Sequence, residues 1–192
     1  CDIAPAMVAI AQANAAAAFQ KVDFKTVGFT KISQAFKNQQ FDVIFCLGNS
    51  LPHVEDLQEL TKTLQDFCQL MRGTGVLVLQ MRNFSRLLQN KERWLEPQDF
   101  AEGNEEFLFQ RFYDFEPDGH IQFNMVSLER KKQGPWESQV ISSMLLPIQR
   151  AQLESILLDC GFGRLQSYGS MDGQPFEEAS SEDLVMTARK LA

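Results

Sequence analysis

The chain has 192 residues, a formal net charge of −7 and a sequence pI of about 4.9, with 44% hydrophobic and 22% charged residues. This composition is typical of a folded globular protein and excludes intrinsic disorder. The acidic balance argues against a nucleic-acid-binding protein, and the lack of any run of about 18 apolar residues argues against a membrane-spanning one.

The N-terminal part of the chain favours short elements around one helix. Asp2 ends a predicted strand, and Pro5 opens a helix of about fifteen residues, because proline suits a first helical turn and the alanines that follow are strong helix formers. Residues 22–29 are predicted as a short strand and residues 30–37 as a short helix.

Two buried strands follow. Residues 41–47 form an almost continuous apolar run, which is typical of a strand covered on both faces in a parallel sheet. Residues 48–52 break this run, and an amphipathic helix extends from there to the glycines of residues 73–75, which are expected to end it. Residues 76–80 are a second buried strand. Alternating strands and helices predict an α/β doubly wound sheet with right-handed crossovers.

The pattern changes in the next third of the chain. Turn signals separate three stretches of alternating side chains, residues 107–115, 121–130 and 140–146. Three strands joined by tight turns predict an antiparallel β-meander, at about residues 105–147, inserted into the α/β domain.

Helical periodicity returns near the C-terminus. Apolar residues over residues 153–160 follow helical spacing, and Gly161 is expected to close that helix. Residues 163–168 and 184–188 are predicted as the two final strands. No linker separates these elements, so we expect a single domain over residues 1–192.

The cysteines do not form a recognisable metal or disulfide pattern. They lie far apart in apolar segments, where a free thiol behaves as a small hydrophobe. Without a Cys-x-x-Cys or Cys-x-His spacing we expect no metal site and a reducing, cytoplasmic compartment. The four residues are Cys1, Cys46, Cys68 and Cys160.

Several polar residues fall at predicted strand ends. In doubly wound sheets, ligands bind beyond the carboxyl ends of the strands, which selects Asp2, Phe29, residues 48–53 and residues 82–83. A carboxylate at Asp2 could accept both hydroxyls of a nucleotide ribose. The alternative is that Asp2 caps the helix that follows it or interacts with that helix's dipole.

Three segments carry a family resemblance. Residues 2–7 (Asp-Ile-Ala-Pro-Ala-Met), with Ala11, resemble the second-strand segment of class I S-adenosylmethionine-dependent methyltransferases. Residues 41–53, ending in Cys-Leu-Gly-Asn-Ser-Leu-Pro-His, are similar to the fourth-strand motif of the same fold, especially in the glycine and sarcosine N-methyltransferase group. Residues 81–84 (Met-Arg-Asn-Phe) match the segment after that group's fifth strand. The resemblance implies a Rossmann-like seven-stranded sheet over essentially the whole chain, with S-adenosyl-L-methionine as cofactor.

The resemblance also implies cofactor contacts. An acidic residue would hold the ribose, an apolar residue and the third-strand loop would meet the adenine, and backbone carbonyls after the fourth strand would face the methionyl part. The corresponding residues here are Asp2, Ile3, Gly28, Phe29, Leu47 and Gly48. Many relatives place an acidic residue in the third-strand loop, and none follows Gly28.

The acceptor side rests on the same resemblance. Asn49 and His53 would stand near the methyl acceptor, and Arg82 would bind a substrate carboxylate, for which its guanidinium fork is suited. Arg111 and Tyr113 share a face of the predicted meander and could form a lid over the acceptor. For a hydroxyl acceptor, His53 or Tyr113 would be the catalytic residue that removes the proton.

Plainer interpretations of these residues stay open. Asn49 and Ser50 could cap the helix that follows, and His53 could be a surface residue in that helix's first turn. Arg82 could pair with a surface carboxylate. The Phe-rich meander could be part of the core and not of a substrate site.

One expected part of the family pattern is not present in the sequence. The glycine-rich loop that follows the family's first strand has no counterpart, since the Gly161-x-Gly163 segment follows a helix. We therefore expect the domain to be N-terminally incomplete here, with residues before Cys1 supplying the first strand and this loop.

The resulting functional prediction is methyl transfer to a small-molecule acceptor, an amine or a carboxylate-bearing metabolite, with no nucleic-acid or membrane partner. A homodimer is one assembly to consider. The alternatives are a non-catalytic cofactor-binding or dimerising module of the same fold, and a different nucleotide-binding α/β enzyme.

Overall fold

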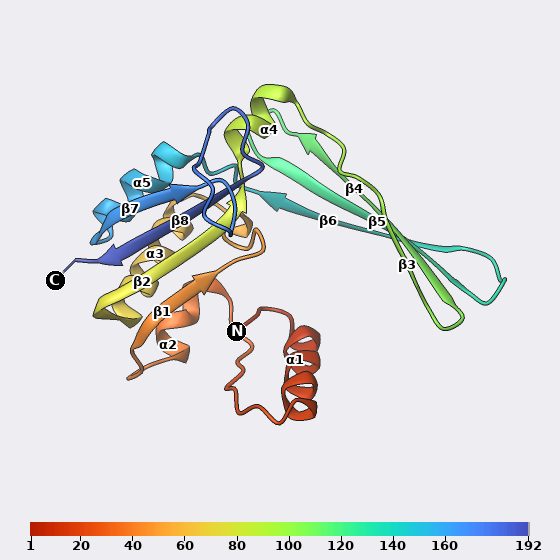
Figure 1. Cartoon of the computed structure of the whole chain (residues 1–192), viewed down its shortest axis with the longest axis horizontal. Helices are drawn as coiled ribbons and strands as arrows, with labels where there is room; N and C mark the ends of the chain where they lie inside the picture. The colour runs from red at the N-terminus through yellow and green to blue at the C-terminus, as the bar shows by residue number, and fades with distance from the viewer. Residues whose placement is uncertain (192) are drawn as a thin grey trace.

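A mixed sheet forms the centre of the molecule. The computed structural model describes residues 1–191, and its main sheet has the strand order β1-β2-β8-β7 (Figure 1). β1 runs parallel to β2, whereas β8 runs antiparallel to both of its neighbours. The strands are β1 (Phe41–Cys46), β2 (Met71–Arg82), β7 (Phe162–Tyr168) and β8 (Asp183–Lys190).

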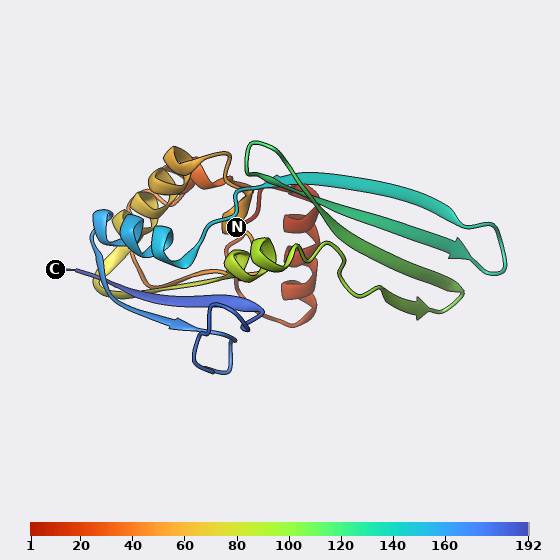
Figure 2. The ribbon, with the colours of Figure 1, turned by 90° about the horizontal axis from the view of Figure 1, so that it is seen from above.

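Helices cover one face of this sheet. The short α2 (Ile32–Ala35), α3 (Leu57–Leu70) and α5 (Arg150–Asp159) lie on the same side of the strands (Figures 1 and 2). Alternate residues of β2 point toward them, so Leu77 and Leu79 are fully buried while their neighbours are half-exposed. The sequence correctly predicted β1, the core of β2, α5 and the two closing strands. The expectation that β1 is covered on both faces is wrong, because β1 is an edge strand and Val43 and Phe45 are exposed.

A second, antiparallel sheet projects away from the first. It has the order β3-β4-β5-β6 and is inserted after α4 (Phe84–Asn90), between β2 and α5; residues 98–145 are called the arm below (Figures 1 and 2). Its strands are β3 (Gln98–Glu102), β4 (Glu105–Phe115), β5 (Ile121–Lys131) and β6 (Glu137–Leu145).

The predicted antiparallel insertion is confirmed, but three strands were one too few. β3 was missed because its sequence, Gln-Asp-Phe-Ala-Glu, is exposed throughout and has no buried face to produce an apolar alternation.

The N-terminal segment holds α1 (Pro5–Ala17), as predicted, and the 3-10 turn η1 (Phe29–Lys31). The strand predicted over residues 22–29 is wrong: the segment is irregular except for a parallel bridge between Asp2 and Thr26. Within the described residues, neither Asp2 nor Thr26 is part of the main sheet beside β1. A strand requires a series of backbone hydrogen bonds to a neighbour, and a single bridge does not provide them. The predicted helix over residues 30–37 is divided between η1 and α2.

The boundaries of α3 also differ from the prediction. Residues 73–75 do not end this helix, because α3 stops at Leu70 and Met71 already has extended dihedral angles as the first residue of β2. Gly75 lies inside β2, where a Cβ would collide with the side chain of Met71. Glycine is therefore required for a close approach within a strand and not for a helix end.

The start of α3 was placed too early as well. Asp56 is its N-cap, and its Oδ1 accepts hydrogen bonds from the backbone N–H groups of Gln58 and Glu59, both at 2.8 Å. The preceding 3-10 turn η2 (Leu51–His53) holds His53, which therefore lies before α3 and not in its first turn. Asn49 and Ser50 do not cap α3.

Two global observations complete the fold. None of the helices in residues 1–191 is long and apolar enough to cross a membrane.

The four cysteines are free thiols, and burial raises the pKa of Cys46 to about 12, so that thiol stays protonated at neutral pH.

Candidate functional site

The turn that follows β1 is bonded to the end of β2. Gly48 and Asn49 have positive φ angles of 70° and 61°. The Gly48 N–H donates to Gln80 Oε1 at 2.7 Å, and the Asn49 N–H donates to the Gln80 carbonyl at 3.2 Å. Asn49 Oδ1 accepts a hydrogen bond from the Arg82 N–H at 3.0 Å. These bonds hold the carboxyl ends of both strands at one edge of the sheet.

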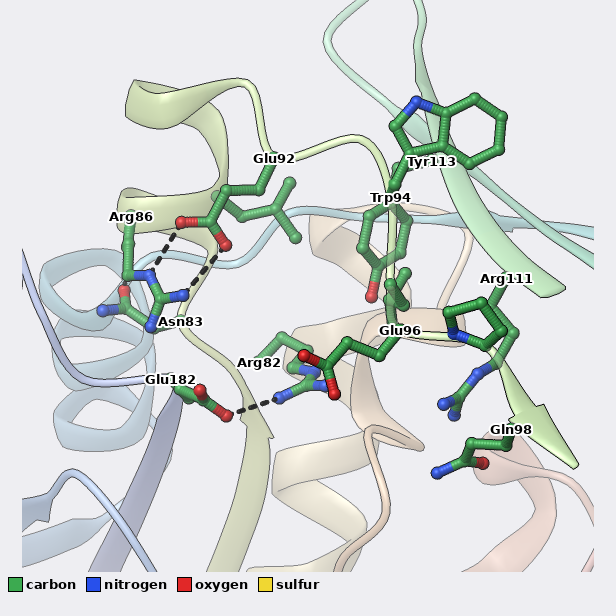
Figure 3. A pocket seen from close by; sticks show the side chains of 13 residues that line it. Arg82, Asn83, Arg86, Glu92, Trp94, Glu96, Gln98, Arg111, Tyr113 and Glu182 are labelled. Carbon is green, nitrogen blue, oxygen red and sulfur yellow. Dashed lines mark hydrogen bonds and ion pairs between the residues drawn. The ribbon is translucent and has the colours of Figure 1, made fainter.

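A cleft lies between the end of β2 and the base of the arm. It has a volume of about 440 Å³ and is called the Arg82 cleft (Figure 3). Arg82 enters it from β2, Arg111 and Tyr113 from β4, and Glu96 from the segment between α4 and β3. The other lining residues are Asn83, Arg86, Leu87, Glu92, Trp94, Leu95, Pro97, Gln98 and Glu182.

Arg82 forms ion pairs at the floor of this cleft. Its Nη1 lies 3.1 Å from Asp183 Oδ1 and 3.8 Å from Glu182 Oε2, with the side chain 36% exposed. The predicted alternative, pairing with a surface carboxylate, is thus present. Both contacts use the same nitrogen, so a guanidinium with five N–H donors retains the capacity to bind an anion in the cleft.

Arg111 and Tyr113 are set differently from Arg82. The Arg111 Nε is buried and has no hydrogen-bond partner within residues 1–191. Burial raises the pKa of Tyr113 above its usual value, and the positive charges of Arg82 and Arg111 oppose that shift. Tyr113 therefore remains a phenol at neutral pH and is suited to hydrogen bonding, not to removing a proton.

Asn83 fixes one wall of the Arg82 cleft. Its side chain is buried, and its Nδ2 donates to the carbonyls of Glu178 and Ser181 at 2.8 and 2.9 Å. The Asn83 N–H donates to the Glu182 carbonyl at 3.0 Å. The segment before β8 is thereby held beside Arg82, which brings Glu182 into the cleft.

A second, larger cleft lies on the other side of the turn. It has a volume of about 800 Å³ and is called the His53 cleft. The N-terminal segment contributes Asp2 and Ile3, and the segment before α2 contributes Gly28 and Phe29. The remaining lining residues are Cys1, Thr26, Val27, Thr30, Lys31, Ser50, His53, Glu55 and Glu59.

Two residues of the His53 cleft have defined local roles. A Cβ at Gly28 would lie 3.3 Å from Ile3 Cδ1, so a larger side chain would press on Ile3. Asp2 Oδ1 accepts a hydrogen bond from the Ala4 N–H at 2.7 Å, just before α1. The capping alternative for Asp2 is wrong, because the N-cap of α1 is Ala4 and no side chain caps this helix, and the Asp2 carboxylate borders the cleft.

His53 is the last residue of η2, and its side chain is exposed at the edge of the His53 cleft. Partial burial lowers its pKa, because desolvation disfavours the imidazolium. The imidazole is then neutral at neutral pH and has a nitrogen able to accept a proton.

The residues predicted from the sequence thus fall into two groups and a connecting turn. Asp2, Ile3, Gly28, Phe29 and His53 line one cleft, whereas Arg82, Arg111 and Tyr113 line the other. The turn between the clefts holds the remaining three, Leu47, Gly48 and Asn49.

Sequence reasoning missed several lining residues, notably Glu96 in the Arg82 cleft and Glu55 and Glu59 in the His53 cleft. Glu59 had a detectable signal, since Asp56-x-x-Glu59 is a helix-start pattern, and Glu59 Oε2 accepts from the Glu55 N–H at 2.6 Å. Nothing local placed Glu96 near Arg82, because that proximity depends on how the arm joins the main sheet.

Comparison with known proteins shows a similar family pattern in the N-terminal residues and a similar overall fold. Residues 1–75 match a family model described as a methyltransferase domain. A crystal structure of an S-adenosylmethionine-dependent methyltransferase from Clostridium acetobutylicum superposes with a TM-score of 0.80 at 14% identity, covering 99% of this chain and 73% of that one. The chain is therefore similar to the methyltransferase-domain family over residues 1–75, and it has the fold of S-adenosylmethionine-dependent methyltransferases. The family resemblance and the Rossmann-like fold inferred from the sequence are both confirmed.

Two curated relatives are similar to this chain in sequence. It is 26% identical over 144 residues to the glycine/sarcosine/dimethylglycine N-methyltransferase of Actinopolyspora halophila, covering 75% of this chain and 22% of that protein. It is 24% identical over 153 residues to the glycine/sarcosine N-methyltransferase of Aphanothece halophytica, covering 76% and 48%. The chain spans about half or less of the length of these relatives.

Proposed function

We propose that this methyltransferase transfers a methyl group from S-adenosyl-L-methionine to the nitrogen of a small amine that carries a carboxylate, with glycine or sarcosine as the first acceptors to test. The observation that carries the proposal is the convergence of two arginines in the Arg82 cleft, where the buried Arg111 Nε has no partner within the described residues. An acceptor carboxylate would satisfy it. The names of the curated relatives support the choice of acceptor.

The residues that line the His53 cleft have side chains suited to binding the cofactor. Asp2 supplies a carboxylate for the ribose hydroxyls, and Ile3 and Phe29 supply apolar surface for the adenine. Gly28 keeps that surface open, because its missing side chain would otherwise meet Ile3. Leu47 and Gly48, in the turn beside the cleft, are the proposed backbone contacts to the methionyl part. When bound, the cofactor supplies a methyl group on a sulfonium, which is a good leaving group.

The chain's own contribution is mainly positioning. An in-line displacement requires the acceptor nitrogen about 3 Å from the methyl carbon, and such positioning can supply roughly 7–11 kcal/mol of the barrier. The bond between Asn49 and Arg82 links the turn beside one cleft to the floor of the other. As the new C–N bond forms and the C–S bond breaks, the acceptor nitrogen loses a proton, and the neutral imidazole of His53 is the proposed acceptor of that proton.

The remaining site residues follow from this scheme. Arg82 binds the acceptor carboxylate together with Arg111, Asn49 lies beside the transferred group, and Tyr113 hydrogen-bonds within the Arg82 cleft. A reducing, cytoplasmic setting is part of the proposal, in keeping with the free thiols of the described chain.

The test is an acceptor comparison with the purified chain. S-adenosylhomocysteine release would be followed with glycine and sarcosine, and with methylamine and dimethylamine, which keep an amine but lack the carboxylate. We expect turnover only with the carboxylate-bearing amines. Equal turnover with the simple amines would refute the carboxylate-binding role, and binding of S-adenosylhomocysteine without turnover on any amine would favour a non-catalytic binding module.

A further inference from the structure

The charged groups that line the Arg82 cleft are not all paired with one another. Arg86 forms a two-point ion pair with Glu92, with distances of 2.8 Å from its Nε and 3.0 Å from its Nη2. Arg82 is paired with the two carboxylates at the start of β8. Two opposite charges of the cleft have no ion pair within residues 1–191, and these are the guanidinium of Arg111 and the carboxylate of Glu96.

Glu96 lies in a segment whose backbone is bonded to β4. The Leu95 N–H donates to the Arg111 carbonyl at 3.1 Å, and Gln110 Nε2 donates to the Leu95 carbonyl at 3.0 Å. Two residues after Glu96, Gln98 begins β3, which again pairs with β4. The Glu96 side chain is exposed and points into the cleft (Figure 3). Its position in the cleft is therefore set by the backbone on both sides of it.

Glu96 and Arg111 start from neighbouring positions of the backbone, because Leu95 is bonded to Arg111. In the part of the chain that the structure describes, no ion pair joins their side chains. Two opposite charges that line one cleft without pairing can each bind the opposite charge of a ligand. Buried polar atoms normally have a partner, and the Arg111 Nε has none within the described residues. The arrangement favours a ligand that carries a negative and a positive charge.

The overall charge of the cleft argues against a purely anionic ligand. Three arginines line it, and three glutamates line it with them. Asp183 adds a fourth carboxylate through its contact with Arg82. The cleft therefore has no excess of positive charge with which to attract an anion from a distance. A zwitterion has no net charge and fits this balance when each of its charges meets the opposite charge in the cleft.

We propose that Glu96 binds the ammonium group of the acceptor, so that the Arg82 cleft takes a zwitterionic amino acid whose carboxylate lies on Arg82 and Arg111. This proposal rests on the acceptor site proposed above and assigns the other end of the acceptor. An aliphatic amine has a pKa of about 10, so the acceptor reaches the cleft as an ammonium at neutral pH. A carboxylate is the protein group that binds an ammonium with a charge-assisted hydrogen bond.

Binding by Glu96 also orients the acceptor nitrogen. An N–H group that donates to Glu96 points toward its carboxylate, and the other bonds of the tetrahedral nitrogen point elsewhere. When the nitrogen loses one of these other protons to His53, the lone pair that forms is directed away from Glu96. Glu96 thus acts as a binding and orienting residue, and it does not take up the proton itself.

The test compares two ligands that share a carboxylate and differ in the ammonium, glycine and acetate. Ligand-detected NMR titrations would be run with S-adenosylhomocysteine present, which has no methyl group to transfer, so binding is measured without turnover. Glu96→Gln should weaken glycine binding at least about 10-fold, because a charge-assisted hydrogen bond is lost. Acetate binding should be unchanged or tighter, because the variant removes a negative charge. The matched control is Glu137→Gln, an exposed residue of β6 outside both clefts, which should bind both ligands normally.

A purely structural role of Glu96 would affect both ligands alike, and retained acetate binding shows that the variant is folded. Glu96→Asp, which keeps the charge on a shorter side chain, should recover part of the glycine affinity. An equal loss for both ligands, or no loss for glycine, would overturn the role of Glu96 and leave the methyl-transfer proposal intact. A loss confined to glycine in a chain that methylates no amine would support the role of Glu96 and refute the activity. If the wild-type chain bound neither ligand, both proposals would be wrong.

Discussion

The side chain of Asn49 accepts a hydrogen bond from the backbone N–H of Arg82 at 3.0 Å, which joins the turn after β1 to the last residue of β2. Asn49 has a φ of 61°, a conformation that asparagine tolerates better than most residues. The same residue therefore provides both the shape of the turn and its attachment. This attachment fixes the separation between the two clefts.

The first prediction separates these two roles of Asn49. Asn49→Ala should destabilise the fold by about 1–3 kcal/mol, because it removes the hydrogen bond and forces alanine into a left-handed conformation. Asn49→Gly should recover only the stability that alanine loses to backbone strain, because glycine adopts the left-handed conformation freely. Asn49→Asp should restore an acceptor for the Arg82 N–H. Urea unfolding would rank the variants. If alanine and aspartate gave the same stability, the hydrogen bond would contribute nothing measurable.

The second prediction concerns Arg82. Arg82→Ala should raise the KM for a carboxylate-bearing acceptor by about 10–150-fold, the equivalent of one charge-assisted hydrogen bond worth 1.5–3 kcal/mol. Binding of S-adenosylhomocysteine, measured by calorimetry, should change little. Arg72→Ala is a suitable control, because Arg72 forms an exposed ion pair with Asp42 outside both clefts. An unchanged KM for Arg82→Ala would show that its ion pairs with Asp183 and Glu182 are purely structural.

Much of the fold could be predicted because its signals are local. The apolar run of β1 and the alternation along β4 and β5 each identify a strand without knowledge of its neighbours. The start of β2 could not be predicted in this way. Residues 73–75 have the composition of a helix end, and the constraint on Gly75 comes from contact with Met71 within the strand.

The candidate site shows the same limit. Arg82 and Asp2 were found because strand ends bind ligands in this fold, and that rule needs only the order of elements. Glu182 was not found, since its place beside Arg82 depends on Asn83, which is bonded to residues 95 and 98 positions later in the chain. Contacts across such separations leave no periodic pattern in the sequence.

The third prediction concerns Asn83 itself. Asn83→Ala should cost about 1–3 kcal/mol of stability, because the carbonyls of Glu178 and Ser181 would lose their buried donor. Asn83→Asp should be worse, since a carboxylate would then face two carbonyl oxygens. Chemical unfolding measures both changes. Equal, near-wild-type stabilities would show that solvent replaces the lost amide donor.

The fourth prediction concerns the pH dependence of stability at His53. Burial lowers its pKa below 6.5, so the folded chain resists protonation of this imidazole while the unfolded chain accepts the proton near pH 6.5. Above that pH the His53 imidazole is neutral in both the folded and the unfolded chain, so it does not make folding stability depend on pH. As the pH falls through 6.5 toward the lowered pKa, the unfolded state gains protons first, and folding stability declines.

His53→Gln isolates this contribution. The variant removes the titrating group and keeps a polar side chain of similar size, while every other ionisable group is the same in both proteins, so its contribution cancels in the difference. Melting temperatures from pH 8 to pH 5 should therefore fall more steeply for the wild-type chain than for the variant. In the acceptor assay, the wild-type rate should decline over the same interval because protonated His53 cannot take up the acceptor's proton. Parallel melting curves would mean that His53 is not desolvated in the folded chain, whereas diverging melting curves with an unchanged pH–rate profile would mean that the His53 imidazole takes no part in proton transfer.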